Sequence, residues 1–229
     1  MDKIELVLSR YAPGFSNFVK VPFYLVLDLF ESVKYGSGAP KKYELLYLRT
    51  NDVARGYKVS RPHHFGVVRY KYWDLDLVAV DDACGGIPGI ARRKVTKEEP
   101  WEECGELERV IAHRKKSGKS EDPKDEDFQR FWNGCYAQLD SLIAEVRETG
   151  RLRTMAEFLT SRRFRERGGI GVCLDSAGEP ILTDGHHRFG IMKGLQIDKI
   201  PVTLHAIHPG FMNIPDWRER LNRLRTDGE

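Results

Sequence analysis

Hydrophobic residues recur at spacings of three and four after residue 127, which is the pattern of an amphipathic helix. Gly150 follows this pattern and is a typical residue for a helix end. The recurring positions are Phe128, Phe131, Trp132, Tyr136, Leu139, Leu142, Ile143 and Val146. A second helix is expected over 155–164, and Trp132, Tyr136 and Trp217 are expected in the core.

Two short apolar stretches separated by a polar turn predict a β-hairpin farther along the chain, with its turn over 175–180. A helix, a strand and a last helix follow the hairpin, and Asp216 can cap the last helix. The expected elements are strands over 170–174, 181–183 and 201–206 and helices over about 187–195 and from 217 onward.

The first 95 residues mix short apolar clusters with turn residues and predict a small sheet. The run 21–30 predicts a short helix with Pro22 in its first turn, because proline is tolerated there. A loop is expected over 36–40. Strands are expected over 43–48, 66–74 and 75–80.

Lysine, glutamate, aspartate and arginine dominate the segment 97–127. Apolar residues recur at helical spacing within 103–115, which predicts a solvent-facing helix, and 117–127 reads as a mobile linker. A run of charges is more often a solvated surface than a binding site. We therefore divide the chain into an N-terminal mixed α/β region, 1–127, with a charged linker near 97–127, and a C-terminal domain, 128–229.

The composition of this 229-residue chain limits its expected partners and its expected cellular compartment. Its formal net charge of +3 is too small to argue by itself for nucleic acid. The four cysteines form no Cys-x-x-Cys pair, which favours a reducing compartment, and we expect a cytoplasmic protein. The start of the chain has no basic region before an apolar run, so no signal peptide is expected. The longest apolar run, 21–30, is interrupted by Asp28 and is too short to span a membrane.

The candidate functional residues lie where the expected hairpin ends and the next helix begins, at Asp184-Gly185-His186-His187-Arg188. A helix start exposes N–H groups without partners and the positive end of the helix dipole, which together favour an anion such as phosphate. Gly185 permits close backbone approach, and Arg188 can grip two phosphate oxygens. His186 and His187 add donors. Asp184 can hold Mg²⁺, a ribose hydroxyl or a backbone donor; the simpler alternative is a capped turn with packed histidines.

The segment 169–206 resembles the nucleotide-binding motif of the ParB/sulfiredoxin superfamily. The likeness lies in a hairpin that ends in Leu-Thr-Asp-Gly-His-His-Arg, the helix Phe-Gly-Ile-Met-Lys-Gly-Leu after it, and the strand Ile-Pro-Val-Thr-Leu. The helix 128–148 stands where the superfamily has the helix before its hairpin. The resemblance implies an α+β fold: a ParB/sulfiredoxin-like C-terminal domain with an elaborated N-terminal region. Residues 1–127 carry no such likeness.

Details of the turn distinguish the members of this superfamily. Sulfiredoxin has a catalytic cysteine where this chain has His186, so its redox chemistry is not expected. Chromosome-partitioning members have a Gly-Glu-Arg-Arg-type box and a following helix-turn-helix domain, for which the stretch after residue 195 is too short. The Asp-Gly-His-His-Arg form is closest to the free-serine kinases, in which an upstream carboxylate is the base. Glu121, Glu126 and Asp127 are candidates for that carboxylate by position alone.

The resemblance implies a small-molecule kinase, a phosphotransferase that uses ATP or ADP with Mg²⁺ and a small hydroxyl-bearing substrate. Asp184 and His186 are then the expected catalytic residues, and Asp184 is the expected Mg²⁺ ligand. The expected nucleotide-binding residues are Thr183, Gly185, His186, His187 and Arg188.

Two other functions stay open. One is a ParB-like nucleic-acid-binding protein or nuclease, which an arginine cluster would suit. Solvent-exposed faces of a helix and a loop are the favoured explanation of this cluster, and DNA is not the expected partner. The other function is a nucleotide-binding regulatory subunit without catalysis. The arginine cluster consists of Arg151, Arg153, Arg162, Arg163, Arg165 and Arg167.

Structural roles are expected for His205 and His208.

Overall fold

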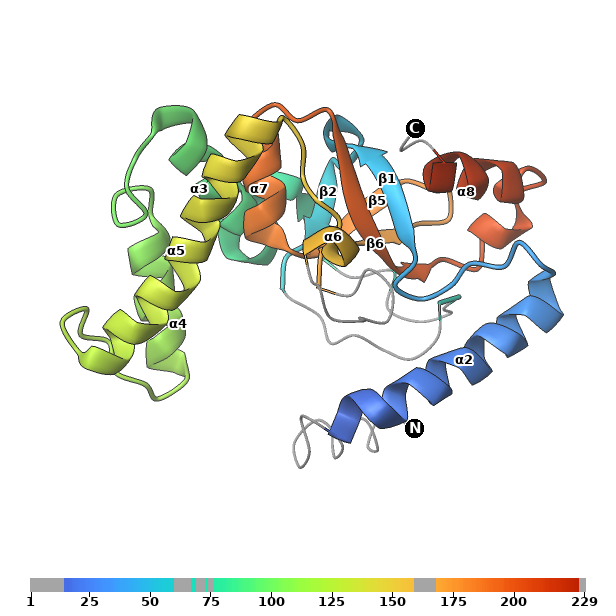
Figure 1. Ribbon diagram of the computed structural model, residues 1–229, viewed down its shortest axis with the longest axis horizontal. Coiled ribbons are helices and arrows are strands. Elements are labelled where there is room, and N and C mark those ends of the chain that lie inside the picture. Colours follow the sequence, from blue (N-terminus) through green and yellow to red (C-terminus); the bar gives the residue numbers. More distant parts are fainter. Residues whose placement is uncertain (1–14, 60–66, 69–72, 74–75, 159–167, 227–229) are drawn as a thin grey trace.

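The computed structural model describes residues 15–59, 67–68, 73, 76–158 and 168–226, which form a mixed α+β structure (Figure 1). Its centre is a six-stranded sheet with the order β1-β6-β4-β5-β2-β3. β4 and β6, and also β2 and β5, run parallel, and the other neighbours are antiparallel. The strands are β1 (Leu45–Arg49), β2 (Arg55–Tyr57), β3 (Leu77–Ala79), β4 (Ile170–Leu174), β5 (Pro180–Asp184) and β6 (Lys199–Ile207).

The sheet joins strands from both sides of the expected boundary at residue 127. The hairpin β4–β5 lies in the middle, with β1 at one edge and β2 and β3 at the other. All residues of β4 and nearly all of β6 are buried, because the sheet is covered on both faces there. The first part of the chain therefore completes the sheet that positions the hairpin.

The helices lie on both sides of this sheet. In Figure 1, α3, α4, α5 and α7 lie to its left, α8 lies to its right beside β1, and α2 runs apart below α8. None of the helices in the described ranges has the length and apolarity that a membrane span requires. The helices are α2 (Phe15–Tyr35), α3 (Ala83–Lys97), α4 (Glu106–Lys116), α5 (Glu126–Thr149), α6 (Met155–Phe158), α7 (His186–Gly194) and α8 (Trp217–Thr226).

Most elements of the C-terminal half confirm the prediction from periodicity. The helix expected after residue 127 is α5; the Asp125 side chain caps its start and Gly150, at φ 69°, ends it. The hairpin, the helix after it and the strand over 201–206 are all present. Trp132, Tyr136 and Trp217 are buried. The helix expected over 155–164 begins as α6, and its continuation past 158 lies outside the described residues.

Two predictions for the N-terminal half were wrong in detail. The helix expected over 21–30 extends over 21 residues, and Pro22 lies inside α2 rather than in its first turn. The helix expected over 103–115 is α4, but it does not face solvent all round, because Glu106, Val110 and Arg114 are buried. Strand 75–80 is confirmed as β3, whereas most of 66–74 lies outside the described residues.

Arg114 ties the expected linker to two helices. Its Nε donates to the Ser120 carbonyl oxygen at 2.7 Å, and its Nη2 donates to the Asp127 carboxylate at 2.7 Å. The segment between α4 and α5 is therefore held by a buried guanidinium at one end and by α5 at the other.

Two glycines let α7 pack closely against α3. A Cβ on Gly190 would lie 2.2 Å from the Pro88 carbonyl oxygen, and a Cβ on Gly194 would lie 2.9 Å from the Val95 Cβ. Since both positions face α3, the spacing of four residues gives α7 one smooth face for its neighbour.

We expect Gly190→Ala to lower the free energy of unfolding by about 2 kcal/mol, because the added methyl group overlaps backbone. The matched control is Gly134→Ala in α5, where an added Cβ meets nothing within 4 Å. That variant should gain about 0.5–1 kcal/mol from helix propensity. Urea unfolding of both variants measures the difference, and equal changes would contradict this account of the α3–α7 contact.

Candidate functional site

The candidate site is built on the junction between β5 and α7. β5 ends at Asp184, α7 begins at His186, and Gly185 between them has φ 67°. A Cβ on Gly185 would lie 2.8 Å from the Ile170 Cα and 2.9 Å from the Gly169 carbonyl oxygen. Only glycine meets both conditions, the left-handed conformation and the close approach of the start of β4.

The first turn of α7 has no side-chain cap among the described residues. Asp184 Oδ1 accepts a hydrogen bond from the Gly185 N–H at 2.8 Å, one residue before the helix. The first N–H of α7 bonded to a preceding carbonyl is that of Phe189, to Gly185 at 2.9 Å. The N–H groups of residues 186–188 therefore need acceptors from outside the helix. At α5, by contrast, the Asp125 side chain accepts two such N–H groups.

His186 is buried at this helix start, with 8% of its surface exposed. Its Nε2 atom has no hydrogen-bond partner among the described residues. Burial lowers the pKa of His186 to about 4; the Asp184 charge opposes this shift, and the charges of His187 and Arg109 add to it. The ring is therefore neutral at pH 7, with a buried polar atom that requires a partner.

The side chain of His187, which was expected to bind the nucleotide, contacts Glu106 of α4. Its Nε2 lies 2.7 Å from Glu106 Oε1, 81 residues away in the chain. The Glu106 carboxylate is fully buried and also accepts hydrogen bonds from Arg109 Nε at 2.8 Å and the Tyr136 hydroxyl at 2.6 Å. The Trp101 ring meets His187 edge to face, at 6.0 Å between centroids. We call these four hydrogen-bonded residues, Glu106, Arg109, Tyr136 and His187, the Glu106 clamp.

The Glu106 clamp contains a carboxylate that stays ionised. Burial by itself would raise the pKa of Glu106, but the hydrogen bonds from Arg109 and His187 outweigh it and hold the pKa at about 2. Burial raises the pKa of Tyr136, and the Glu106 charge raises it further. A carboxylate with so low a pKa and so many donors is a weak base. Its effect is to fix α7 to α4 and α5.

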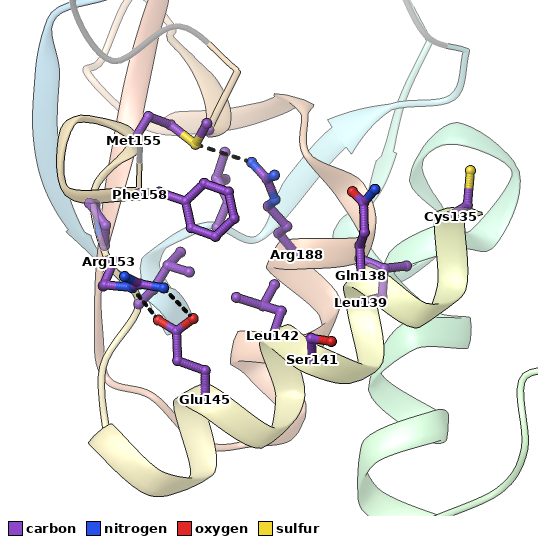
Figure 2. A pocket seen from close by; sticks show the side chains of 14 residues that line it. Cys135, Gln138, Leu139, Ser141, Leu142, Glu145, Arg153, Met155, Phe158 and Arg188 are labelled. Atoms are coloured by element: carbon purple, nitrogen blue, oxygen red, sulfur yellow. Dashed lines mark hydrogen bonds and ion pairs between the residues drawn. The ribbon is translucent and has the colours of Figure 1, made fainter. Parts of the chain in front are cut away.

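Arg188 reaches into a cavity beside the turn. Its Nη1 donates to the Gly168 carbonyl oxygen and lies 3.4 Å from Met155 Sδ. Figure 2 shows the guanidinium between Met155 and Gln138, in the lining of a cavity of about 440 Å³. α5, α6 and the start of β4 form the other walls.

Thr183, expected to bind the nucleotide, is engaged within the sheet. Its Oγ1 lies 2.9 Å from Nδ1 of the buried His205. The His205 ring lies over Gly171, where a Cβ would come within 2.3 Å of the ring. The three residues stand on adjacent strands, β5, β6 and β4. Their contacts indicate a structural role for His205. His208 Nδ1 likewise accepts from the Gly210 N–H at 2.9 Å.

The structure thus brings Asp184, Gly185, His186 and Arg188 together at one turn and directs His187 into the clamp. Sequence reasoning missed Glu106, whose only local signal is the i,i+3 pairing with Arg109. The three acids that were candidates by position lie elsewhere: Glu121 pairs with Lys115, Asp127 pairs with Arg114, and Glu126 begins α5.

The expected arginine cluster and the expected metal ligand can also be compared with the described part of the chain. Arg151 pairs with Glu157 and Arg153 pairs with Glu145. The other arginines of that cluster, 162–167, lie outside the described residues. No group of three or more His, Cys, Asp or Glu side chains that could hold a metal ion occurs within the described ranges.

Comparisons of the chain with protein-family models, with curated proteins and with solved structures find no match.

Glu106→Ala should lower the free energy of unfolding by on the order of 3 kcal/mol, because it leaves the buried Tyr136 hydroxyl and the half-buried donors of Arg109 and His187 without their acceptor. Glu108→Ala, an exposed carboxylate on the same helix, is the control and should change stability by about 0.5 kcal/mol or less. Denaturant titration compares them. A loss for Glu106→Ala as small as that of the control would show that the clamp does not hold the helices.

The buried His186 predicts a pH dependence of stability. Its pKa in the folded state is about 4, below the ordinary 6.5, so its contribution is complete above pH 6.5 and is lost as the pH falls toward 4. Between these limits the wild type should lose on the order of 3 kcal/mol more than His186→Gln, which does not titrate. Unfolding measured at pH 7 and pH 4 gives both values. Parallel losses in the two proteins would mean that the folded state does not lower the pKa of His186.

Proposed function

We propose that this chain binds a nucleotide by its phosphates at the start of α7 and transfers a phosphoryl group to a hydroxyl of a small molecule. The observation that carries the proposal is an uncapped helix start beside a buried ring nitrogen, His186 Nε2, that has no partner among the described residues. Both features require hydrogen-bonding partners from outside, and phosphate oxygens meet the requirement at a helix N-terminus.

Each residue of the turn has a distinct part in this proposal. The N–H groups of His186, His187 and Arg188 point along the helix axis toward the bound phosphates. Gly185 allows the phosphates to approach the backbone. The Arg188 guanidinium binds phosphate oxygens from the cavity side, and neutral His186 supplies one hydrogen bond. The side chains of the Glu106 clamp position this turn without touching the nucleotide.

Asp184 is the carboxylate proposed for the transfer step. It is half-buried at the end of β5, and one of its oxygens accepts the Gly185 N–H. In the transfer, the acceptor oxygen forms a bond to the γ-phosphorus while the bond from that phosphorus to the bridging oxygen breaks. The hydroxyl proton passes to Asp184, and the nucleoside diphosphate leaves. Such a reaction depends mainly on positioning and on charge neutralisation.

A magnesium ion would have one carboxylate ligand from the protein at this site. Mg²⁺ is commonly held by one or two carboxylates together with phosphate oxygens and water, and Asp184 can supply one carboxylate. When bound, the ion would neutralise charge on the phosphates. The described residues provide no dedicated cage for it.

The likeness to the ParB/sulfiredoxin superfamily supports the proposal. The order hairpin, helix and strand, found here as β4, β5, α7 and β6, is the order that the resemblance implies. Within that superfamily the Asp-Gly-His-His-Arg box is closest to small-molecule kinases, and ATP or ADP is the nucleotide that we propose. Nucleic-acid binding has less support, because Arg151 and Arg153 already pair with Glu157 and Glu145.

Two substitutions separate binding from transfer. Asp184→Asn keeps an oxygen to accept the Gly185 N–H, so nucleotide affinity should change little. It removes the base, and turnover should fall by a factor on the order of 100 or more. Arg188→Ala should instead weaken nucleotide binding by about one to two powers of ten.

Calorimetry with ATP and Mg²⁺ measures the affinity, and phosphorus NMR measures the transfer. Normal turnover in Asp184→Asn would remove this carboxylate from the mechanism. Unchanged nucleotide affinity in a folded Arg188→Ala variant would argue against phosphate binding at this turn.

A further inference from the structure

The cavity beside Arg188 has walls made largely of carbon. α5 supplies Leu139 and Leu142, α6 supplies Met155 and Phe158, and Leu152 and Ile170 add to this apolar part of the lining. The polar side chains of Gln138 and Ser141 also line the cavity, besides its charged groups. Figure 2 shows Leu142, Met155 and Phe158 around the same space as Arg188. Its volume of about 440 Å³ lies within the range of small-molecule pockets.

The charged groups of this cavity lie at two separate places. Glu145 and Arg153 pair with each other through two hydrogen bonds, the second at 2.7 Å, so their charges compensate each other. Arg188 belongs to the first turn of α7, and its planar fork of five N–H donors can hold a ligand oxygen alongside the Gly168 carbonyl. The cavity is therefore suited to a molecule with an apolar body and with oxygen at the end near Arg188.

The cavity and the turn share a wall. Gly169 and Ile170 line the cavity, and the same two residues lie against Gly185 at the start of α7. Arg188 is common to both sites. A molecule in the cavity with its hydroxyl toward Arg188 would thus lie beside the phosphates of a nucleotide bound at the turn.

We propose that this cavity binds the phosphoryl acceptor, and that the acceptor is a small alcohol with an apolar aliphatic or aromatic body. This inference rests on the proposed function. The acceptor oxygen forms a bond to the γ-phosphorus while the bond from that phosphorus to the bridging oxygen breaks, and the nucleoside diphosphate leaves. The hydroxyl proton passes to Asp184, the residue before Gly185 at the wall that the turn and the cavity share. A compact polar alcohol would leave the carbon walls in contact with water and would gain little from them.

The test compares alcohols of increasing apolar size with the full-length protein. Glycerol, L-serine, 1-butanol, 1-hexanol and 2-phenylethanol are supplied with ATP and Mg²⁺, and phosphorus NMR follows formation of the phosphate ester. We expect kcat/KM to rise by about tenfold or more from glycerol to 2-phenylethanol, since an apolar pocket discriminates by about this factor for each added group.

Variants at Leu142 connect that preference to the cavity. Leu142→Trp fills the space and should lower kcat/KM for 2-phenylethanol by about tenfold, and Leu142→Ala should shift the preference toward larger alcohols. ATP affinity, measured by calorimetry, should stay near the wild-type value in both variants. Phe131→Trp is the control, because Phe131 is an exposed aromatic residue of the same helix outside the cavity lining.

The outcomes distinguish the two proposals. If ATP binds and is consumed equally well with glycerol or serine, or if the Leu142 variants leave the preference unchanged, the acceptor inference is overturned while the proposed function stands. If ATP neither binds nor reacts with any of the alcohols, both proposals fall.

Discussion

The candidate site depends on one buried carboxylate, that of Glu106. Taking an ionised carboxylate out of water is costly unless donors surround it, and here three side chains from α4, α5 and α7 provide them. The same bonds that hold Glu106 in its charged form therefore join three helices. Because His187 is the second residue of α7, the clamp fixes the direction of the first turn of that helix. The N–H groups of this turn are then oriented before any ligand arrives, which reduces the entropic cost of binding.

The side chains of three consecutive residues of α7 lie in three different environments. Successive positions of a helix point about 100° apart, so neighbours in the sequence cannot share one contact. His186 is buried, and its Nε2 has no hydrogen-bond partner among the described residues. His187 joins the clamp, and Arg188 reaches into the cavity. This division explains how a run of three polar residues can combine a phosphate site with a rigid support for it.

The sequence predicted those parts of the structure that depend on local pattern. The periodicity after residue 127 specifies α5, and the polar turn between two apolar stretches specifies the hairpin. The strand order could not be predicted, because β1 and β2 pair with strands more than a hundred residues away. The start of α2 was misplaced because proline usually marks a first turn, whereas here it lies inside the helix.

The same contrast holds for the candidate site. The turn at Asp184 to Arg188 was predicted, because glycine followed by polar residues at a helix start has a local physical meaning. Glu106 was assigned to a solvated run of charges, because its partners Tyr136 and His187 are 30 and 81 residues away in the chain. The cavity was also beyond prediction, since α5, α6 and β4 create it only when they meet.

The most direct test of the central claim is a titration of isotope-labelled protein with ATP and Mg²⁺, followed through the backbone amide signals in NMR spectra. The account predicts that the amides of His186, His187 and Arg188 shift most strongly and saturate together, because their N–H groups bind the phosphates. The control amides are those of Asp127 and Phe128, which the Asp125 side chain already caps and which should stay unchanged. Saturable ATP binding that leaves the three α7 amides unmoved would contradict the account.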